Sequence, residues 1–178
     1  MSFLLPFLYV SGLSLILLFI LVFIISQIWS RRTADLRLVS IQEKIRNAKA
    51  DGKDFYELGV IFLSKKLYDQ AIINFRYALN LWELDDKTGL ANLYNTIGFT
   101  YTQIAQYDLA LFYYEKALLH EPNYLVTLKN IGFIYEKTNN LVKAKDIYLQ
   151  ILKYDVDNKF ATDKLNLLTG RLIRDDRI

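Results

Sequence analysis

Hydrophobic and small side chains recur at helical spacing through the segment 91–124. Two such stripes follow each other there, namely Tyr94, Ile97, Gly98 and Tyr101, then Ala110, Tyr114 and Ala117. Because residues three and four apart lie on one side of an α-helix, each stripe predicts an amphipathic helix. Pro122 ends the second helix, since proline has no N–H to donate to a helical hydrogen bond. The segment therefore predicts a helical hairpin.

The hairpin pattern occurs three times, over residues 52–85, 91–124 and 125–158. The first stripe of each unit contains one glycine, and these are Gly59, Gly98 and Gly132. The second stripes contain small residues, and these are Ala71, Ala78, Ala110, Ala117 and Ala144. We expect the glycines to let the second helix approach closely, because glycine has no Cβ. A phosphate-binding loop is the alternative, but the glycines stand singly and no GxxxxGK motif occurs.

The first unit contains an insertion of five residues. Gly59 and Gly98 are 39 residues apart, whereas Gly98 and Gly132 are 34 apart. Apolar residues continue as far as Leu84 in this unit. This continuation predicts an extra turn on its second helix, followed by a helix cap at Asp86.

Short polar side chains mark the expected beginnings of several helices. Asp69 and Asp108 are predicted N-caps of the second helices, because a carboxylate can accept hydrogen bonds from free backbone N–H groups. Asn158 is expected to cap a last helix in the segment 159–178, which ends in a charged tail. One side of that helix is apolar, as required to cover the open end of a stack of repeats.

An apolar segment without charged side chains precedes the repeats, and residues 3–29 are expected to form a transmembrane anchor. About 20 apolar residues suffice to cross a bilayer. Arg31 and Arg32 follow the segment and no basic residue precedes it, so the positive-inside rule places the C-terminal side in the cytoplasm or the stroma. A cleaved signal peptide is disfavoured, because a basic start and a small-residue cleavage site are both missing.

Residues 30–51 are expected to form a basic amphipathic linker helix. Between Arg31 and Lys53 there are seven basic and three acidic residues, a balance of +4. The basic side could bind anionic lipid. A solvated face that only sets the topology is the favoured alternative.

The composition excludes several kinds of chemistry. The chain has no cysteine and a single histidine, His120, so it offers no thiolate nucleophile and no cysteine or paired-histidine metal site. The residues from Asp54 onward are close to neutral, unlike a nucleic-acid-binding surface. We therefore expect no catalytic residue, metal, cofactor, small-molecule substrate or nucleic-acid partner. His120 is expected at a helix end, where an imidazole can interact with the terminal carbonyls.

Over residues 52–158 the repeated pattern resembles the tetratricopeptide repeat (TPR) superfamily. The resemblance implies an all-α protein. We expect an N-terminal transmembrane helix, followed by an α-solenoid of three TPR helical hairpins with a C-terminal capping helix.

In TPR folds, the side of each first helix that the packing stripe leaves free faces a groove that holds an extended peptide or a partner helix. The residues expected on this side are Tyr56, Asn92, Asn95, Phe99, Gln103, Lys129, Phe133 and Lys137. Packing between neighbouring repeats is the alternative for Phe99 and Phe133. The two-carboxylate clamp of the chaperone-cofactor branch is absent, because its positions hold Tyr56, Val60, Thr96, Val126 and Asn130.

The whole architecture looks like the thylakoid-anchored TPR proteins of plastids and cyanobacteria, which are implicated in photosystem I assembly or stability. The resemblance implies a scaffold without catalysis that binds photosystem I subunits or assembly intermediates from the stroma or cytoplasm. The alternatives are a docking receptor for precursor proteins and a TPR protein of bacterial envelope assembly.

Overall fold

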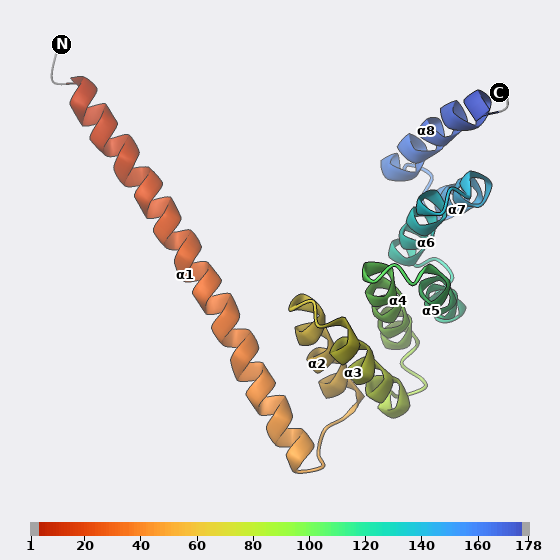
Figure 1. Cartoon of the computed structure of the whole chain (residues 1–178), viewed down its shortest axis with the longest axis horizontal. Coiled ribbons are helices and arrows are strands. Elements are labelled where there is room, and N and C mark those ends of the chain that lie inside the picture. Colours follow the sequence, from red (N-terminus) through yellow and green to blue (C-terminus); the bar gives the residue numbers. More distant parts are fainter. Residues whose placement is uncertain (1–3, 176–178) are drawn as a thin grey trace. The chain divides into compact units, whose positions relative to one another are not determined.

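The computed structural model describes residues 4–175, with side chains described at 8–29, 32 and 36–170. Within this part of the chain every regular element is an α-helix (Figure 1). The helices belong to two compact units that divide between Lys49 and Ala50. The prediction of an all-α fold is confirmed, and the predicted tail beyond residue 175 lies outside the described residues.

The first unit is a single long helix, α1 (Leu4–Arg46). Its segment Leu8–Trp29 has 22 residues and a mean hydropathy of 2.9, so it is long and apolar enough to cross a bilayer. The hydroxyls of Ser11 and Ser14 donate hydrogen bonds to backbone oxygens of the same helix, at 3.0 and 3.1 Å. These bonds satisfy both hydroxyls within the apolar segment. The helix continues without a break into the basic segment and ends at Arg46.

The second unit is a stack of helical hairpins (Figure 1). Its helices are α2 (Gly52–Ser64), α3 (Tyr68–Leu81), α4 (Lys87–Gln103), α5 (Tyr107–His120), α6 (Leu125–Lys137), α7 (Leu141–Tyr154) and α8 (Lys159–Asp175). The first helices α2, α4 and α6 pack against the second helices α3, α5 and α7, and α8 packs on α7. The predicted solenoid of three hairpins with a capping helix is confirmed.

Each hairpin closes through an aromatic ring that lies on a helical glycine. A Cβ on Gly98 would lie 2.7 Å from Tyr114 Cδ1, and one on Gly132 would lie 2.6 Å from Tyr148 Cε1. A Cβ on Gly59 would overlap the ring of Phe75 in the same way. The small residues of the second helices are fully buried beside these rings, and they are Ala71, Ala78, Ala110, Ala117 and Ala144. The packing role predicted for the glycines is therefore confirmed.

The two helices of each hairpin are joined by a turn residue with positive φ. These residues are Lys66, Ala105 and Asn139, with φ of 60°, 57° and 57°. In the central hairpin, the N–H of Ala105 donates to the oxygen of Thr102 at 3.1 Å, and the N–H of Gln106 donates to the oxygen of Tyr101 at 3.0 Å. This pair of bonds is the Schellman arrangement that ends many helices, usually with glycine at the left-handed position.

The prediction that Asp69 and Asp108 are N-caps is wrong. The N-caps of α3 and α5 are Leu67 and Gln106, and neither makes a side-chain capping hydrogen bond. In both hairpins a single N-cap residue separates the left-handed turn residue from the helix, so the aspartates lie in the first helical turn. A carboxylate there still interacts favourably with the positive end of the helix dipole.

The caps predicted at Asp86 and Asn158 are confirmed. Asp86 Oδ1 accepts a hydrogen bond from the N–H of Gly89 at 2.8 Å, and Asn158 Oδ1 accepts one from the N–H of Ala161 at 3.1 Å. Asn140 caps α7 by accepting from the N–H of Lys143 at 3.3 Å. That cap was not predicted from the sequence.

The extra turn predicted on the second helix of the first repeat is wrong. α3 has 14 residues, the same as α5 and α7, and it ends at Leu81. The inserted residues instead lengthen α4, which has 17 residues against 13 in α6. Trp82 leaves the helix with extended φ and ψ of −74° and 141°, and its indole N–H donates to Asp86 Oδ2 at 3.2 Å. This contact stops α3 although its apolar pattern continues.

The glycine contact can be tested by substitution at Gly98. Gly98→Leu is expected to lower the free energy of unfolding by about 1 to 3 kcal/mol or more, because the side chain would overlap the ring of Tyr114. Gly170→Leu is the matched control, since a Cβ at this α8 position meets no atom within 4 Å. Chemical unfolding of the full-length protein in detergent, followed by circular dichroism, measures both. Equal stability of the two variants would contradict the packing role.

Candidate partner-binding surface

One side of the first helices remains uncovered by the second helices, and we call it the first-helix face. It is formed by Tyr56 and Val60 on α2, by Asn92, Thr96, Phe99 and Gln103 on α4, and by Lys129, Phe133 and Lys137 on α6. These positions alternate with the glycine stripe that packs against the second helices. The face therefore continues from one repeat to the next.

A row of exposed apolar side chains runs along the first-helix face. Val60, Phe99 and Phe133 are 38%, 40% and 43% exposed. Each is the residue directly after a packing glycine, and one step along an α-helix rotates the side chain by about 100°. A glycine that faces the second helix thus turns the next residue outward. Packing between repeats therefore does not bury Phe99 and Phe133, and both side chains remain accessible.

A ladder of polar contacts joins α2, α4 and the N-cap of α6 on the same face. Asn92 Nδ2 donates to the hydroxyl of Tyr56 at 3.2 Å, and the hydroxyl of Tyr124 donates to Asn92 Oδ1 at 3.3 Å. The hydroxyl of Tyr56 also lies 3.3 Å from Thr96 Oγ1. Tyr56 belongs to α2 and Tyr124 is the N-cap residue of α6, so the amide of Asn92 is held between α2 and the start of α6.

The orientation of Asn92 is stable at neutral pH. Burial raises the pKa of Tyr124 above its ordinary value, and the nearby Glu121 raises it further. The hydroxyl of Tyr124 therefore remains protonated and donates to Asn92. The exposed amide of Asn92 keeps one N–H and one lone pair free for a ligand.

Asn95 does not belong to the exposed surface, and the expectation that it faces a ligand needs correction. Its side chain is buried, with 8% exposure. Its Oδ1 accepts hydrogen bonds from Thr127 Oγ1 and Asn130 Nδ2, both at 3.1 Å. Because α6 covers this position, Asn95 connects the second repeat to the third.

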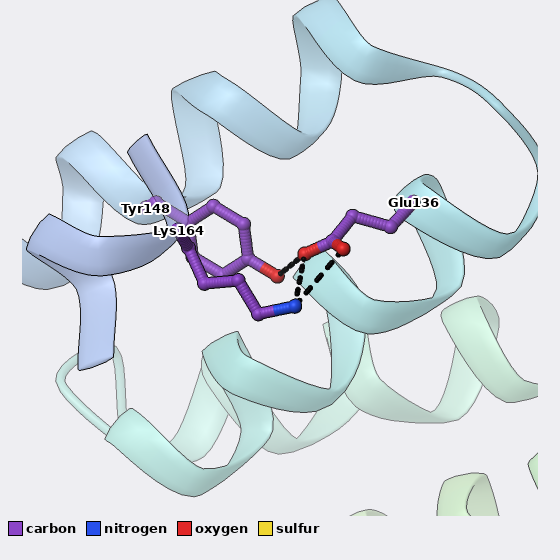
Figure 2. Close-up of polar contacts among 3 residues, drawn as sticks. All are labelled: Glu136, Tyr148 and Lys164. Atoms are coloured by element: carbon purple, nitrogen blue, oxygen red, sulfur yellow. Dashed lines mark hydrogen bonds and ion pairs between the residues drawn. The ribbon is translucent and has the colours of Figure 1, made fainter. Parts of the chain in front are cut away.

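The C-terminal end of the stack is held by Glu136, Tyr148 and Lys164 (Figure 2). Lys164 Nζ on α8 lies 3.0 Å from both carboxylate oxygens of Glu136. The hydroxyl of Tyr148 donates to the same carboxylate. Burial, together with the adjacent carboxylate, raises the pKa of Tyr148 well above its ordinary value, so this hydroxyl remains a donor.

Two lysines of the third repeat interact with aromatic rings. Lys137 Nζ lies 5.5 Å from the ring centroid of Phe133, and Lys129 Nζ lies 5.2 Å from that of Phe160 on α8. Lys137 is exposed, and Lys129 is half-buried. Gln103 is exposed at the C-terminal end of α4.

His120 takes part in the packing of the central hairpin. Its ring stacks on Tyr94 at 5.5 Å between centroids and 13° between planes. It is the last residue of α5, as expected from the sequence. Among the described residues there is no group of three or more histidine, aspartate or glutamate side chains that could hold a metal ion.

The second helices also expose apolar side chains, on the opposite side of the hairpins. Tyr77 on α3 and Phe112 on α5 are 53% and 51% exposed. A shallow pocket of about 240 Å³ lies on α3, and its described lining is Ile73, Arg76, Tyr77 and Asn80. Exposed apolar side chains therefore do not by themselves show which of the two faces binds a ligand. The first-helix face differs in its hydrogen-bonded ladder that spans the repeats.

Comparisons with known proteins agree with this geometry. The sequence signature of the tetratricopeptide repeat matches residues 55–118. The chain is 35% identical over 165 residues to the protein ycf37 of Cyanophora paradoxa. The aligned part covers 93% of this chain and 95% of that protein. It is 31% identical over 150 residues to the chloroplastic TPR domain-containing protein PYG7 of Arabidopsis thaliana. That alignment covers 84% of this chain and 50% of that protein.

A solved structure has the same fold at low sequence identity. YrrB, described as a TPR protein with an unusual peptide-binding site, superposes with a TM-score of 0.65 and 17% identity. The match covers 80% of this chain and 71% of that chain. The stacked hairpins thus define a TPR solenoid, a class of protein-interaction scaffold. Within this class, the chain belongs to the ycf37 family.

The different roles of Asn95 and Asn92 can be tested by the same substitution at both positions. Asn95→Ala is expected to lower the free energy of unfolding by about 1 to 3 kcal/mol, because the buried hydroxyl of Thr127 loses its acceptor. Asn92→Ala, on the same helix but exposed, is expected to lower it by less than about 1 kcal/mol. Thermal and chemical unfolding measure both. A larger loss for Asn92→Ala would contradict this assignment.

Proposed function

We propose that this protein is a membrane-anchored scaffold that assists the assembly or stability of photosystem I by holding its subunits or intermediates on the first-helix face. Binding, without catalysis, is the activity in this proposal. The observation that carries it is an exposed apolar row beside an oriented polar ladder, built on repeats that follow in sequence a segment long and apolar enough to span a membrane.

The first-helix face supplies the two kinds of contact that peptide recognition needs. Phe99 and Phe133 can bury apolar side chains of a partner, each with a gain of about 1.5 to 3 kcal/mol for full burial. The free donor and acceptor of Asn92 can bond one peptide unit of an extended segment. Because Tyr56 and Tyr124 already orient this amide, little further ordering is required on binding.

The anchor supports a role at a membrane. Leu8–Trp29 can span a bilayer, and Arg31 and Arg32 follow it directly. By the positive-inside rule the repeats would lie in the stroma or cytoplasm. There the anchored repeats are concentrated near other membrane proteins, which raises their effective concentration for partners in the same membrane.

The relatives support a plastid setting. PYG7 is described as chloroplastic, and ycf37 of Cyanophora paradoxa matches 93% of the chain. A thylakoid location and a photosystem I partner rest on the resemblance of the complete architecture to thylakoid-anchored TPR proteins. Together with the plastid relatives, this resemblance favours photosystem I over other membrane complexes.

Deletion of the protein in its source organism tests the proposal. The ratio of photosystem I to photosystem II, from P700 absorbance and low-temperature fluorescence, is expected to fall several-fold. Re-expression of the native chain should restore the ratio, whereas the double variant Phe99→Ala with Phe133→Ala should not. The double variant Tyr77→Ala with Phe112→Ala is the matched control on the second-helix side, and it should restore the ratio. An unchanged ratio in the deletion strain, under both normal growth and stress, would contradict the role in photosystem I assembly.

A further inference from the structure

The charges on the first-helix face are unevenly distributed. α4 carries no charged residue after Lys87, so the centre of the face is neutral. α6 contributes Lys129 and Lys137, which lie one helical turn before and after Phe133. The third repeat therefore presents an aromatic ring between two positive charges.

The acidic group on α6 is already engaged. Glu136 is the single carboxylate of this helix, and it is bound by Lys164 through both oxygens and by the hydroxyl of Tyr148 (Figure 2). Lys129 and Lys137 form no salt bridge within the described part of the chain, and their contacts there are with aromatic rings. Two ammonium groups on this face thus have no opposite charge to neutralise them.

From this arrangement we infer that the partner binds as an extended segment with an acidic side chain two residues away from an apolar one. The inference rests on the proposed function and specifies the chemistry of its ligand. The apolar side chain packs on Phe133, and the carboxylate pairs with Lys137 or Lys129, one helical turn to either side of that ring.

The spacing follows from the distances on α6. Lys137 Nζ lies 5.5 Å from the centre of the Phe133 ring. In an extended chain, residues two apart point to the same side and are separated by about 6.6 Å. A segment with the order apolar, any residue, acidic can therefore reach the ring and the ammonium together. A helical ligand has no free backbone groups for Asn92, so the oriented amide favours the extended form.

Selection of peptides by the full-length protein in phosphatidylcholine nanodiscs tests this inference. The probe is a phage-displayed library of random 12-residue peptides. Phage that bind empty nanodiscs are removed before each round of selection. Enriched peptides are expected to carry Asp or Glu two residues from Phe, Leu, Ile or Trp. Binding of a synthetic enriched peptide should weaken as salt is raised, because exposed charge pairs are screened.

Matched lysine variants separate this face from the rest of the surface. Lys129→Gln with Lys137→Gln should weaken binding of the enriched peptide by roughly 2- to 5-fold and flatten its salt dependence, as expected for the loss of one exposed ion pair. Lys116→Gln with Lys143→Gln is the control, because these lysines also lie over aromatic rings, at 5.5 and 5.4 Å, but belong to the second helices. This control should bind as the native chain does.

The outcomes distinguish the inference from the proposed function. Enriched peptides without acidic residues, or a Lys129 and Lys137 variant with unchanged affinity and salt dependence, would overturn the inference alone. In that case, loss of binding in Phe99→Ala with Phe133→Ala would still support the first-helix face as the binding surface. Unchanged binding in the phenylalanine variant, or no enrichment over empty nanodiscs, would count against both.

Discussion

The structure of the repeats depends on one contact, an aromatic ring of the second helix lying directly on a glycine of the first. Glycine inside a helix costs about 1 kcal/mol relative to alanine, and the close approach of the ring offsets this cost. The rings of Tyr114 and Tyr148 are fully buried. Burial raises the pKa of Tyr114 to about 12, so its hydroxyl stays neutral and remains within 3.2 Å of Thr102 Oγ1.

The same contact determines what the protein can present to a partner. Because each glycine points to the second helix, the residue after it points away, and Val60, Phe99 and Phe133 form a row with one member per repeat. The contacts of Asn92 with Tyr56 and Tyr124 then fix the repeats relative to one another on that face. A binding surface of this kind requires rigid spacing and no chemically reactive group.

The features that could be predicted from the sequence are those that follow from the local spacing of apolar and small residues. They are the apolar span, the three hairpins and the glycine contacts. The errors arise where a particular side-chain contact, and not the periodicity, decides. Trp82 stops α3 because its indole is held by Asp86, although the apolar pattern runs on. Asn95 has the helical spacing of an exposed residue, but α6 covers it through Thr127. Lys164 looks like a solvent-facing lysine until the fold brings Glu136 beside it.

The central claim is that partners bind the first-helix face and not the second-helix side. Site-specific photo-crosslinking in intact membranes tests it directly, with benzoylphenylalanine placed at Phe99 or at Phe112, which are 40% and 51% exposed. Adducts with photosystem I subunits are expected from position 99, and few or none from position 112. Adducts that form equally from both positions, or mainly from position 112, would contradict it.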